Sequence, residues 1–255
     1  MIFAKEMSNL GNKKSFEITS FWLHILAMIF MLCDHLWGTI IPGNEWLTCI
    51  GRIAFPLYAF MIVEGYFHTN NLKKYVGRLF VFALISEIPF NLAMGSSISY
   101  IIHQNVLWSF LIAILLIYLN EKVKNKKLFI KILVGLSTTL LGFGLGFITF
   151  VDFYGYGILM VLAFYFFRGR TYWKYILQFL SMAYINVSLM KGLSYEVNLF
   201  NKVYWIPQQA FAMLALIPIW LYKGKQGPYN KTIQYVYYAF YPLHLLILGL
   251  IKIYI

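Results

Sequence analysis

The segment Phe21–Ile41, FWLHILAMIFMLCDHLWGTII, decides the fold class of this chain because it is long and apolar. A helix rises about 1.5 Å per residue, so a segment of this length crosses a hydrocarbon core about 30 Å thick. Lys13 and Lys14 precede the segment, but no small-residue cleavage site follows it, and it is longer than the core of a signal peptide. The segment therefore predicts a transmembrane helix that is retained in the protein.

The same pattern recurs along the rest of the chain. Of its 255 residues, 61% are hydrophobic and only 12% are charged, which leaves too little polar surface for a water-soluble globule. The apolar runs are continuous and do not alternate as the strands of a membrane barrel do. We expect an all-α polytopic membrane protein of about nine transmembrane helices, forming a single domain over residues 1–255. The eight further predicted spans are Cys49–His68, Tyr75–Met94, His103–Asn120, Leu128–Phe150, Asp152–Phe167, Tyr172–Met190, Tyr204–Tyr222 and Thr232–Tyr254.

The basic residues predict the orientation of these spans. If the spans alternate in direction, 17 of the 21 Lys and Arg residues fall on one side of the membrane. By the positive-inside rule that side is cytoplasmic, so the N-terminus is cytoplasmic and the C-terminus exterior. The net charge of +12 then reflects this topology, with a contribution from basic residues that contact anionic membrane lipid. No nucleic acid partner is expected. The residues on this side are Lys5, Lys13, Lys14, Lys73, Lys74, Arg78, Lys122, Lys124, Lys126, Lys127, Lys131, Arg168, Arg170, Lys174, Lys223, Lys225 and Lys231.

Ionisable residues within the spans are the candidates for function, because a charge at the bilayer centre costs roughly 2.5–3.5 kcal/mol on insertion scales. Counted by helical rise, one group lies in the exterior half of the membrane or near its middle. A second group lies at the cytoplasmic ends of the spans. The exterior group is Asp34, His35, Arg52, Glu87 and His244, and the cytoplasmic group is His24, Glu64, His68 and Arg78.

Several of these residues also have structural interpretations. Arg52 lies close enough to the exterior face to extend into the interface, or it neutralises Glu87. Glu64 and His68, one helical turn apart, either end their helix at the interface or form one side of a metal site. No third and fourth ligand come at a recognisable spacing, so no metal is expected. Cys33 and Cys49 are the only cysteines and predict no disulfide framework.

Five segments in order along most of the chain resemble the TraX family of bacterial membrane proteins. They contain an Asp-His pair, Gly-Arg-Ile-Ala-Phe-Pro, Ser-Glu-Ile-Pro-Phe and Tyr-Pro-Leu-His. The segments are HILAMIFMLCDHLW, GRIAFPLYAFMIVEGYFHT, RLFVFALISEIPFNLA, YGYGILMVLAFYFFR and YYAFYPLHLLIL. The family takes its name from a protein that acetylates the amino terminus of a conjugative pilin. The resemblance implies a membrane acyltransferase, N- or O-acetylating, in the bacterial plasma membrane.

That resemblance implies acetyl-CoA or another acyl-CoA as the donor substrate, with roles for the candidate residues. His35 is the expected general base, Arg52 an electrostatic stabiliser or the partner of Glu87, and His244 a second proton carrier or substrate contact. Either Asp34 or Glu87 could orient His35. The chain is also similar to membrane O-acyltransferases, which place a basic residue eleven positions before the first-helix histidine; here that residue is His24 rather than Arg or Lys. Donor-binding candidates on the cytoplasmic side are His24, Glu64, His68, Lys73, Lys74 and Arg78.

Two other functions remain open. A proton-coupled transporter would also need buried Asp, Glu and His residues. A noncatalytic partner in a conjugation or secretion assembly is the third interpretation. For the enzyme, a peptide N-terminus of the pilin kind, a surface glycan or a lipid head group would each present a suitable nucleophile, and neither the acceptor nor the acyl chain length is set by these residues.

Overall fold

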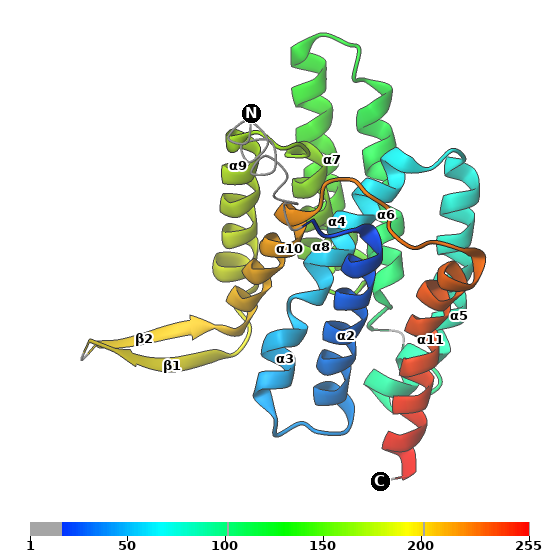
Figure 1. Ribbon diagram of the computed structural model, residues 1–255, viewed down its shortest axis with the longest axis vertical. Helices are drawn as coiled ribbons and strands as arrows, with labels where there is room; N and C mark the ends of the chain where they lie inside the picture. The colour runs from blue at the N-terminus through cyan, green and yellow to red at the C-terminus, as the bar shows by residue number, and fades with distance from the viewer. Residues whose placement is uncertain (1–16, 101, 201, 255) are drawn as a thin grey trace, which may run out of the picture.

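The computed structural model describes residues 17–100, 102–200 and 202–254, and almost all of the regular structure in them is helical (Figure 1). Lys5, Lys13 and Lys14, three of the 17 basic residues that predict the orientation, lie outside the described residues. The helices before the hairpin are α2 Ser20–Thr39, α3 Glu45–Gly51, α4 Ala54–His68, α5 Leu72–Gly95, α6 Val106–Lys122, α7 Leu128–Ile148, α8 Tyr154–Phe166 and α9 Tyr172–Ala183, continued by the π-helix η1 Tyr184–Met190. After the strands β1 Ser194–Leu199 and β2 Lys202–Pro207 come the 3-10 helix η2 Gln208–Ala215, α10 Leu216–Leu221 and α11 Lys231–Tyr254.

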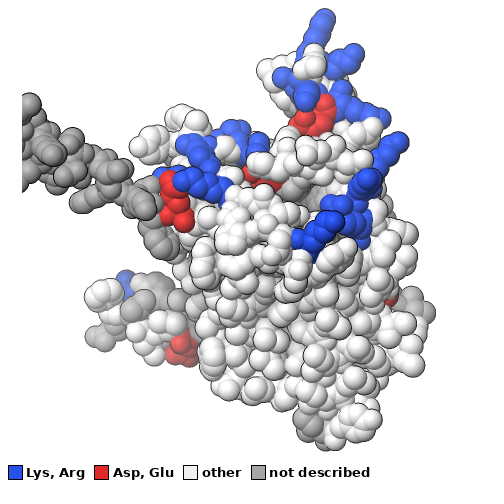
Figure 2. Space-filling view, turned by 45° about the vertical axis from the view of Figure 1, so that its right-hand side comes forward, with Lys and Arg blue, Asp and Glu red and all other residues white. Residues whose placement is uncertain are grey.

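The membrane character of the protein is confirmed by these helices. Within the described residues, five helical segments are long and apolar enough to cross a bilayer: Ser20–Thr39, Glu45–His68, Leu72–Gly95, Leu128–Ile148 and Lys231–Tyr254. Large apolar side chains are exposed along α5 and α7, as expected of surfaces that face lipid. In Figure 2 the Lys and Arg side chains gather mainly at one end of the molecule, which we call the basic end, above a broad uncharged face. The count of nine spans and the orientation stay predictions.

Two segments differ from the predicted spans. Tyr204–Pro207, the start of the predicted eighth span, belongs instead to β2, which pairs antiparallel with β1. This hairpin projects sideways from the helices (Figure 1). Strand β2 contains Val, Tyr and Trp, which favour strands as readily as they favour membrane helices, so apolarity alone did not separate the two structures. The protein is therefore nearly all-α rather than all-α.

The predicted second span, Cys49–His68, also contains a break that its hydrophobicity did not indicate. Helix α3 ends at Gly51 and α4 begins at Ala54. Pro56 explains the break, because it has no N–H to donate to the Arg52 carbonyl four residues earlier. The chain turns at Arg52, and this positions its side chain beside α2.

The arrangement of the helices brings distant parts of the chain together. Helix α8 is buried at the centre, against α4, α6 and α7. Helix α11, at the end of the chain, packs along α5 and also contacts α2 (Figure 1). His35 on α2 and His244 on α11, 209 positions apart in the sequence, are therefore neighbours.

The predicted orientation can be tested with single cysteines in a Cys33→Ala, Cys49→Ala background. Asn44, in the turn between α2 and α3, and Asn198, on the hairpin, are exposed away from the basic end, whereas Asn125 is exposed between α6 and α7. We expect a membrane-impermeant maleimide to label Asn44→Cys and Asn198→Cys in intact cells, and to label Asn125→Cys only after permeabilisation. Labelling of Asn125→Cys in intact cells would reverse the orientation.

Candidate functional site

Asp34 and His35 are adjacent on α2 but face different helices. Successive residues on a helix point about 100° apart, and the structure shows the consequence. Asp34 faces α3, where its Oδ1 pairs with Arg52 Nη2 and accepts a hydrogen bond of 2.7 Å from Thr48 Oγ1. His35 faces α11. The two residues do not form a dyad.

Thr48 joins the Asp34–Arg52 ion pair to a third element. Its hydroxyl oxygen accepts from Arg52 Nη2 at 3.0 Å and from Gln208 Nε2, at the start of η2, at 2.9 Å. Gly51 makes this approach of α3 to α2 possible, because a Cβ at Gly51 would lie 2.4 Å from the Cβ of Asp34. Arg52 thus has Asp34 as its carboxylate partner, and not Glu87, which was the alternative from the sequence.

His35 and His244 form a direct contact across α2 and α11. His35 Nδ1 lies 2.6 Å from His244 Nε2, and the rings stack with centroids 4.9 Å apart. His244 Nδ1 lies 2.6 Å from the backbone carbonyl of Phe240. Pro242 lies inside α11 between these two residues.

These contacts fix where the protons lie when both imidazoles are neutral. A carbonyl oxygen only accepts hydrogen bonds, so His244 Nδ1 carries a proton and donates a hydrogen bond to the Phe240 carbonyl. His244 Nε2 is then an acceptor, and His35 Nδ1 donates to it. The remaining nitrogen, His35 Nε2, keeps a lone pair. This is the protonation state that a general base requires.

Glu87 belongs to a separate cluster on α5 and α6. Its Oε2 accepts from Asn105 Nδ2 and, at 2.9 Å, from Trp108 Nε1. Its Oε1 is buried without a hydrogen-bond partner among the described residues. Neither Asp34 nor Glu87 orients His35 in the described part of the chain; the contact to His35 comes from His244.

A histidine and an aspartate that the sequence did not single out meet near Glu87. His103 Nε2 lies 3.1 Å from Asp152 Oδ1, in the loops before α6 and before α8. Burial by itself would lower the pKa of His103, but the hydrogen bond to Asp152 and the charges of Asp152 and Glu87 outweigh it and raise that pKa above its usual value. Backbone strain accompanies the pair, since Phe150, Phe153 and Tyr154 all have positive φ.

The principal cavity, of about 490 Å³, begins at the basic end and extends towards the His35–His244 pair. At the basic end it is lined by His24, Glu64 and His68, and its inner end by Met31, Tyr58 and Tyr241. The Tyr241 ring separates it from the histidines, with its centroid 6.3 Å from that of His35. His24 stacks on Tyr237 at 4.2 Å and its Nδ1 donates to the Ser20 carbonyl, so its Nε2 is the unprotonated nitrogen when the ring is neutral.

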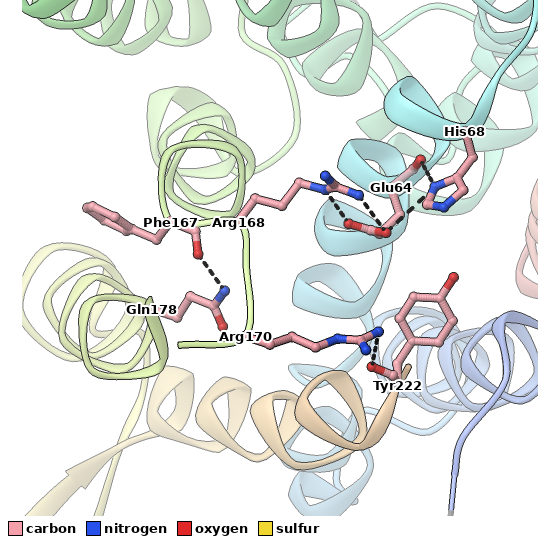
Figure 3. A network of polar contacts seen from close by, with 7 residues as sticks. All are labelled: Glu64, His68, Phe167, Arg168, Arg170, Gln178 and Tyr222. Carbon is pink, nitrogen blue, oxygen red and sulfur yellow. Dashed lines mark hydrogen bonds and ion pairs between the residues drawn. The ribbon is translucent and has the colours of Figure 1, made fainter. Parts of the chain in front are cut away.

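Glu64 is held by an arginine from the loop between α8 and α9 (Figure 3). Arg168 Nε donates to Glu64 Oε1 at 2.6 Å and its Nη2 to Oε2 at 3.2 Å, a two-point ion pair. His68 Nδ1 donates to the Glu64 carbonyl at 2.8 Å and lies 3.6 Å from Oε2. Arg170 Nη2 donates, at 3.5 Å, to the backbone carbonyl of Tyr222, which lines the cavity.

The other predicted donor-binding residues lie on the outer surface of α5. Lys73, Lys74 and Arg78 are exposed, and Arg78 Nε donates to the Tyr238 hydroxyl at 3.2 Å. Tyr238 lines the cavity, so Arg78 is one side chain removed from it. Within the described residues, no group of three or more His, Cys, Asp or Glu side chains is placed to hold a metal ion.

The structure adds partners that sequence reasoning missed. Thr48, Gln208, Asn105 and Trp108 are ordinary polar or aromatic residues, and nothing in their spacing marks them. Arg168 and Arg170 were counted only as topology signals.

Comparison with known proteins identifies the family. Residues 21–252 match the family described as TraX protein. The chain belongs to the TraX family. Among curated proteins, this TraX member is 25% identical over 258 residues to the probable fimbrial assembly protein FimC, serogroup H1, of Dichelobacter nodosus, an alignment that covers 95% of this chain and 99% of the relative. No solved structure gives a significant match.

The Asp34–Arg52 pair can be tested by a double-mutant cycle. Arg52→Met leaves the largely buried Asp34 carboxylate without its counter-ion, so we expect a loss of roughly 3–5 kcal/mol of stability. Asp34→Asn in the same chain should recover much of it, because no charge is then left unpaired. Thermal unfolding in detergent measures both; a double variant no more stable than Arg52→Met would show that the pair is not the stabilising contact.

The His103–Asp152 contact predicts a pH dependence. Because the pKa of His103 is raised in the folded protein, its stabilising contribution is complete below the pKa of an unfolded histidine and is lost as pH rises through the folded value. Wild-type protein should exceed His103→Gln in stability by about 1 kcal/mol at pH 5.5, and by less at pH 8.5. A gap that stays constant across this range would mean that His103 does not become charged.

Proposed function

We propose that this TraX member is a membrane-embedded acyltransferase that moves an acyl group, most simply acetyl, from a cytoplasmic acyl-CoA to an amine or hydroxyl on the exterior side of the bacterial plasma membrane. The observation that carries the proposal is the His35–His244 contact, which leaves a lone pair on His35 Nε2. A partly buried and oriented imidazole is suited to accept a proton from an attacking nucleophile. A cavity that leads from the basic end towards this imidazole supports the same conclusion.

The proposed reaction at His35 is a single acyl transfer. His35 Nε2 takes the proton of the acceptor while the acceptor nitrogen or oxygen forms a bond to the thioester carbonyl carbon. The C–S bond breaks, and the leaving thiolate receives the proton from His35, which returns the imidazole to its neutral state. While His35 is charged, its Nδ1–H remains hydrogen-bonded to His244, which orients the ring and disperses the charge.

Arg52 supplies a positive charge near the same imidazole. Its guanidinium is held by Thr48 and by Asp34, the residue next to His35 on α2. A fixed positive charge is suited to stabilise the oxyanion that forms on the thioester carbonyl. In this proposal Asp34 is a positioning residue that acts through Arg52. Glu87 lies outside this group, in the separate cluster on α5 and α6.

The two sides of the membrane then have separate tasks. The donor enters from the basic end, where His24, Glu64 and His68 line the cavity, and its acyl group reaches past Tyr241 to His35. The acceptor approaches from the exterior side. This layout allows an acyl group to cross the membrane while the coenzyme remains in the cytoplasm.

A noncatalytic role in pilus assembly is the second candidate, and the name of the Dichelobacter relative, a probable fimbrial assembly protein, favours it. Both functions would serve pilus assembly if the acyl acceptor is the amino terminus of a pilin-like peptide. Comparative mass spectrometry of envelope proteins and glycans from cells with and without the gene distinguishes the two functions. Loss of an acetyl mass from one component indicates the enzyme, whereas unassembled pilin of unchanged mass indicates the noncatalytic role.

The general base can be tested with His35→Gln, which keeps a hydrogen-bonding side chain but cannot cycle a proton near neutral pH. We expect acetylation of the component identified above to fall by roughly 100- to 10,000-fold. His244→Gln should cause a smaller loss, because His35 keeps its own Nε2. Both variants should insert and unfold as wild-type protein does. A His35→Gln protein that acetylates at a near wild-type rate between pH 6 and 8 would rule out His35 as the base.

A further inference from the structure

A second cavity, of about 300 Å³, opens at the basic end beside the first. The two cavities share Phe60, Glu64, His68, Tyr222 and Gly224 as lining residues, so they meet along one wall. The second cavity is also lined by Arg168, Gly169 and Arg170, and by the rings of Tyr175 and Trp220. Each volume is within the range of roughly 300–1,000 Å³ that is typical of small-molecule sites.

The loop between α8 and α9 turns both arginines towards this cavity (Figure 3). Gly169, between them, has a φ of +137°, a conformation that side chains disfavour, so the Arg-Gly-Arg turn depends on glycine at this position. Two guanidinium groups on one wall are suited to bind phosphate oxygens, because each presents a fork of N–H donors.

Another part of the lining of the second cavity is aromatic and held in position. The rings of Tyr175 and Trp220 have centroids 5.3 Å apart. Trp220 Nε1 donates to Gln178 Oε1 at 2.8 Å, and Gln178 Nε2 donates to the Phe167 carbonyl at 2.9 Å. Rings held in this way offer a platform on which a nucleobase can stack.

We infer that the second cavity binds the phosphorylated nucleotide portion of a coenzyme A thioester, with Arg168 and Arg170 on the phosphates and the aromatic wall against the base. The acyl-bearing arm then extends through the shared wall into the first cavity. Glu64 competes with the phosphates for Arg168, so the Glu64–Arg168 ion pair opens when the donor binds. The inference rests on the proposed function and places the nucleotide at Arg168 and Arg170 rather than at Lys73, Lys74 and Arg78.

Binding of free coenzyme A to the purified full chain in lipid nanodiscs tests this assignment, since it requires no acceptor and no turnover. Arg170→Gln should weaken the affinity about tenfold or more, as expected for loss of a charge-assisted phosphate contact. Arg170 is a suitable residue to change because, within the described residues, its hydrogen bond to the Tyr222 carbonyl is long, at 3.5 Å. Lys126→Gln, which removes the same charge from the exposed loop between α6 and α7, is the matched control and should bind as wild type does.

A substitution at Glu64 should change the affinity for coenzyme A in the opposite direction. Glu64→Gln frees Arg168 and should tighten binding by several-fold, whereas a purely structural ion pair would give weaker binding when broken. Glu64→Gln, Arg168→Gln, which leaves no unpaired charge, should lose that gain and bind more weakly than wild type. Pantetheine, which lacks the phosphates, should bind weakly and with no dependence on Arg168 or Arg170.

Three outcomes would overturn the inference. Binding that weakens in Arg78→Gln but not in Arg170→Gln would place the phosphates on α5 and leave the acyltransferase proposal intact. Pantetheine that binds as tightly as coenzyme A would show that the protein does not contact the phosphates. Failure of wild-type protein to bind coenzyme A at all would remove both the inference and the proposed donor.

Discussion

The pairing of Asp34 with Arg52 is the interaction on which the rest of the site depends. Neither charge is tolerated in an apolar environment without the other, and the pair is formed only because Gly51 allows α3 to approach α2 closely. Once Asp34 is engaged by α3, the helical geometry turns His35 in another direction, towards α11. One ion pair therefore fixes α3, places Arg52, and leaves the imidazole free to meet His244.

Most of the helical architecture could be predicted from hydrophobicity, because the bilayer requires long apolar segments with satisfied backbones. The segments Phe21–Ile41, Tyr75–Met94 and Thr232–Tyr254 all correspond to helices within a few residues. The hairpin of β1 and β2 was not predicted from the sequence, because its aromatic and β-branched residues suit a strand and a membrane helix alike. The break before α4 does not show in the hydropathy of its segment, and Pro56 is the residue that marks it in the sequence, because its missing N–H bends a helix.

The candidate site was predictable in its residue types but not in its partners. The cost of burying charge selected Asp34, His35, Arg52 and His244 from the sequence, and the structure brings all four to neighbouring positions on α2, α3 and α11. Which residues pair depends on helix packing, which a list of spans does not contain. The same limit applies to Arg168, whose two-point contact with Glu64 joins residues 104 positions apart in the chain.

The lengths of the helices have a consequence for the lipid around the protein. Helix α7 has 21 residues, about 32 Å, and most of its surface is exposed, whereas the central α8 has 13 residues, about 20 Å, and is mostly buried. Bilayer thickness therefore acts on α7 and not on α8. A thinner membrane would tilt or strain the outer helix while the centre, screened from lipid, keeps its geometry. The outer helices thus shield the interior from hydrophobic mismatch.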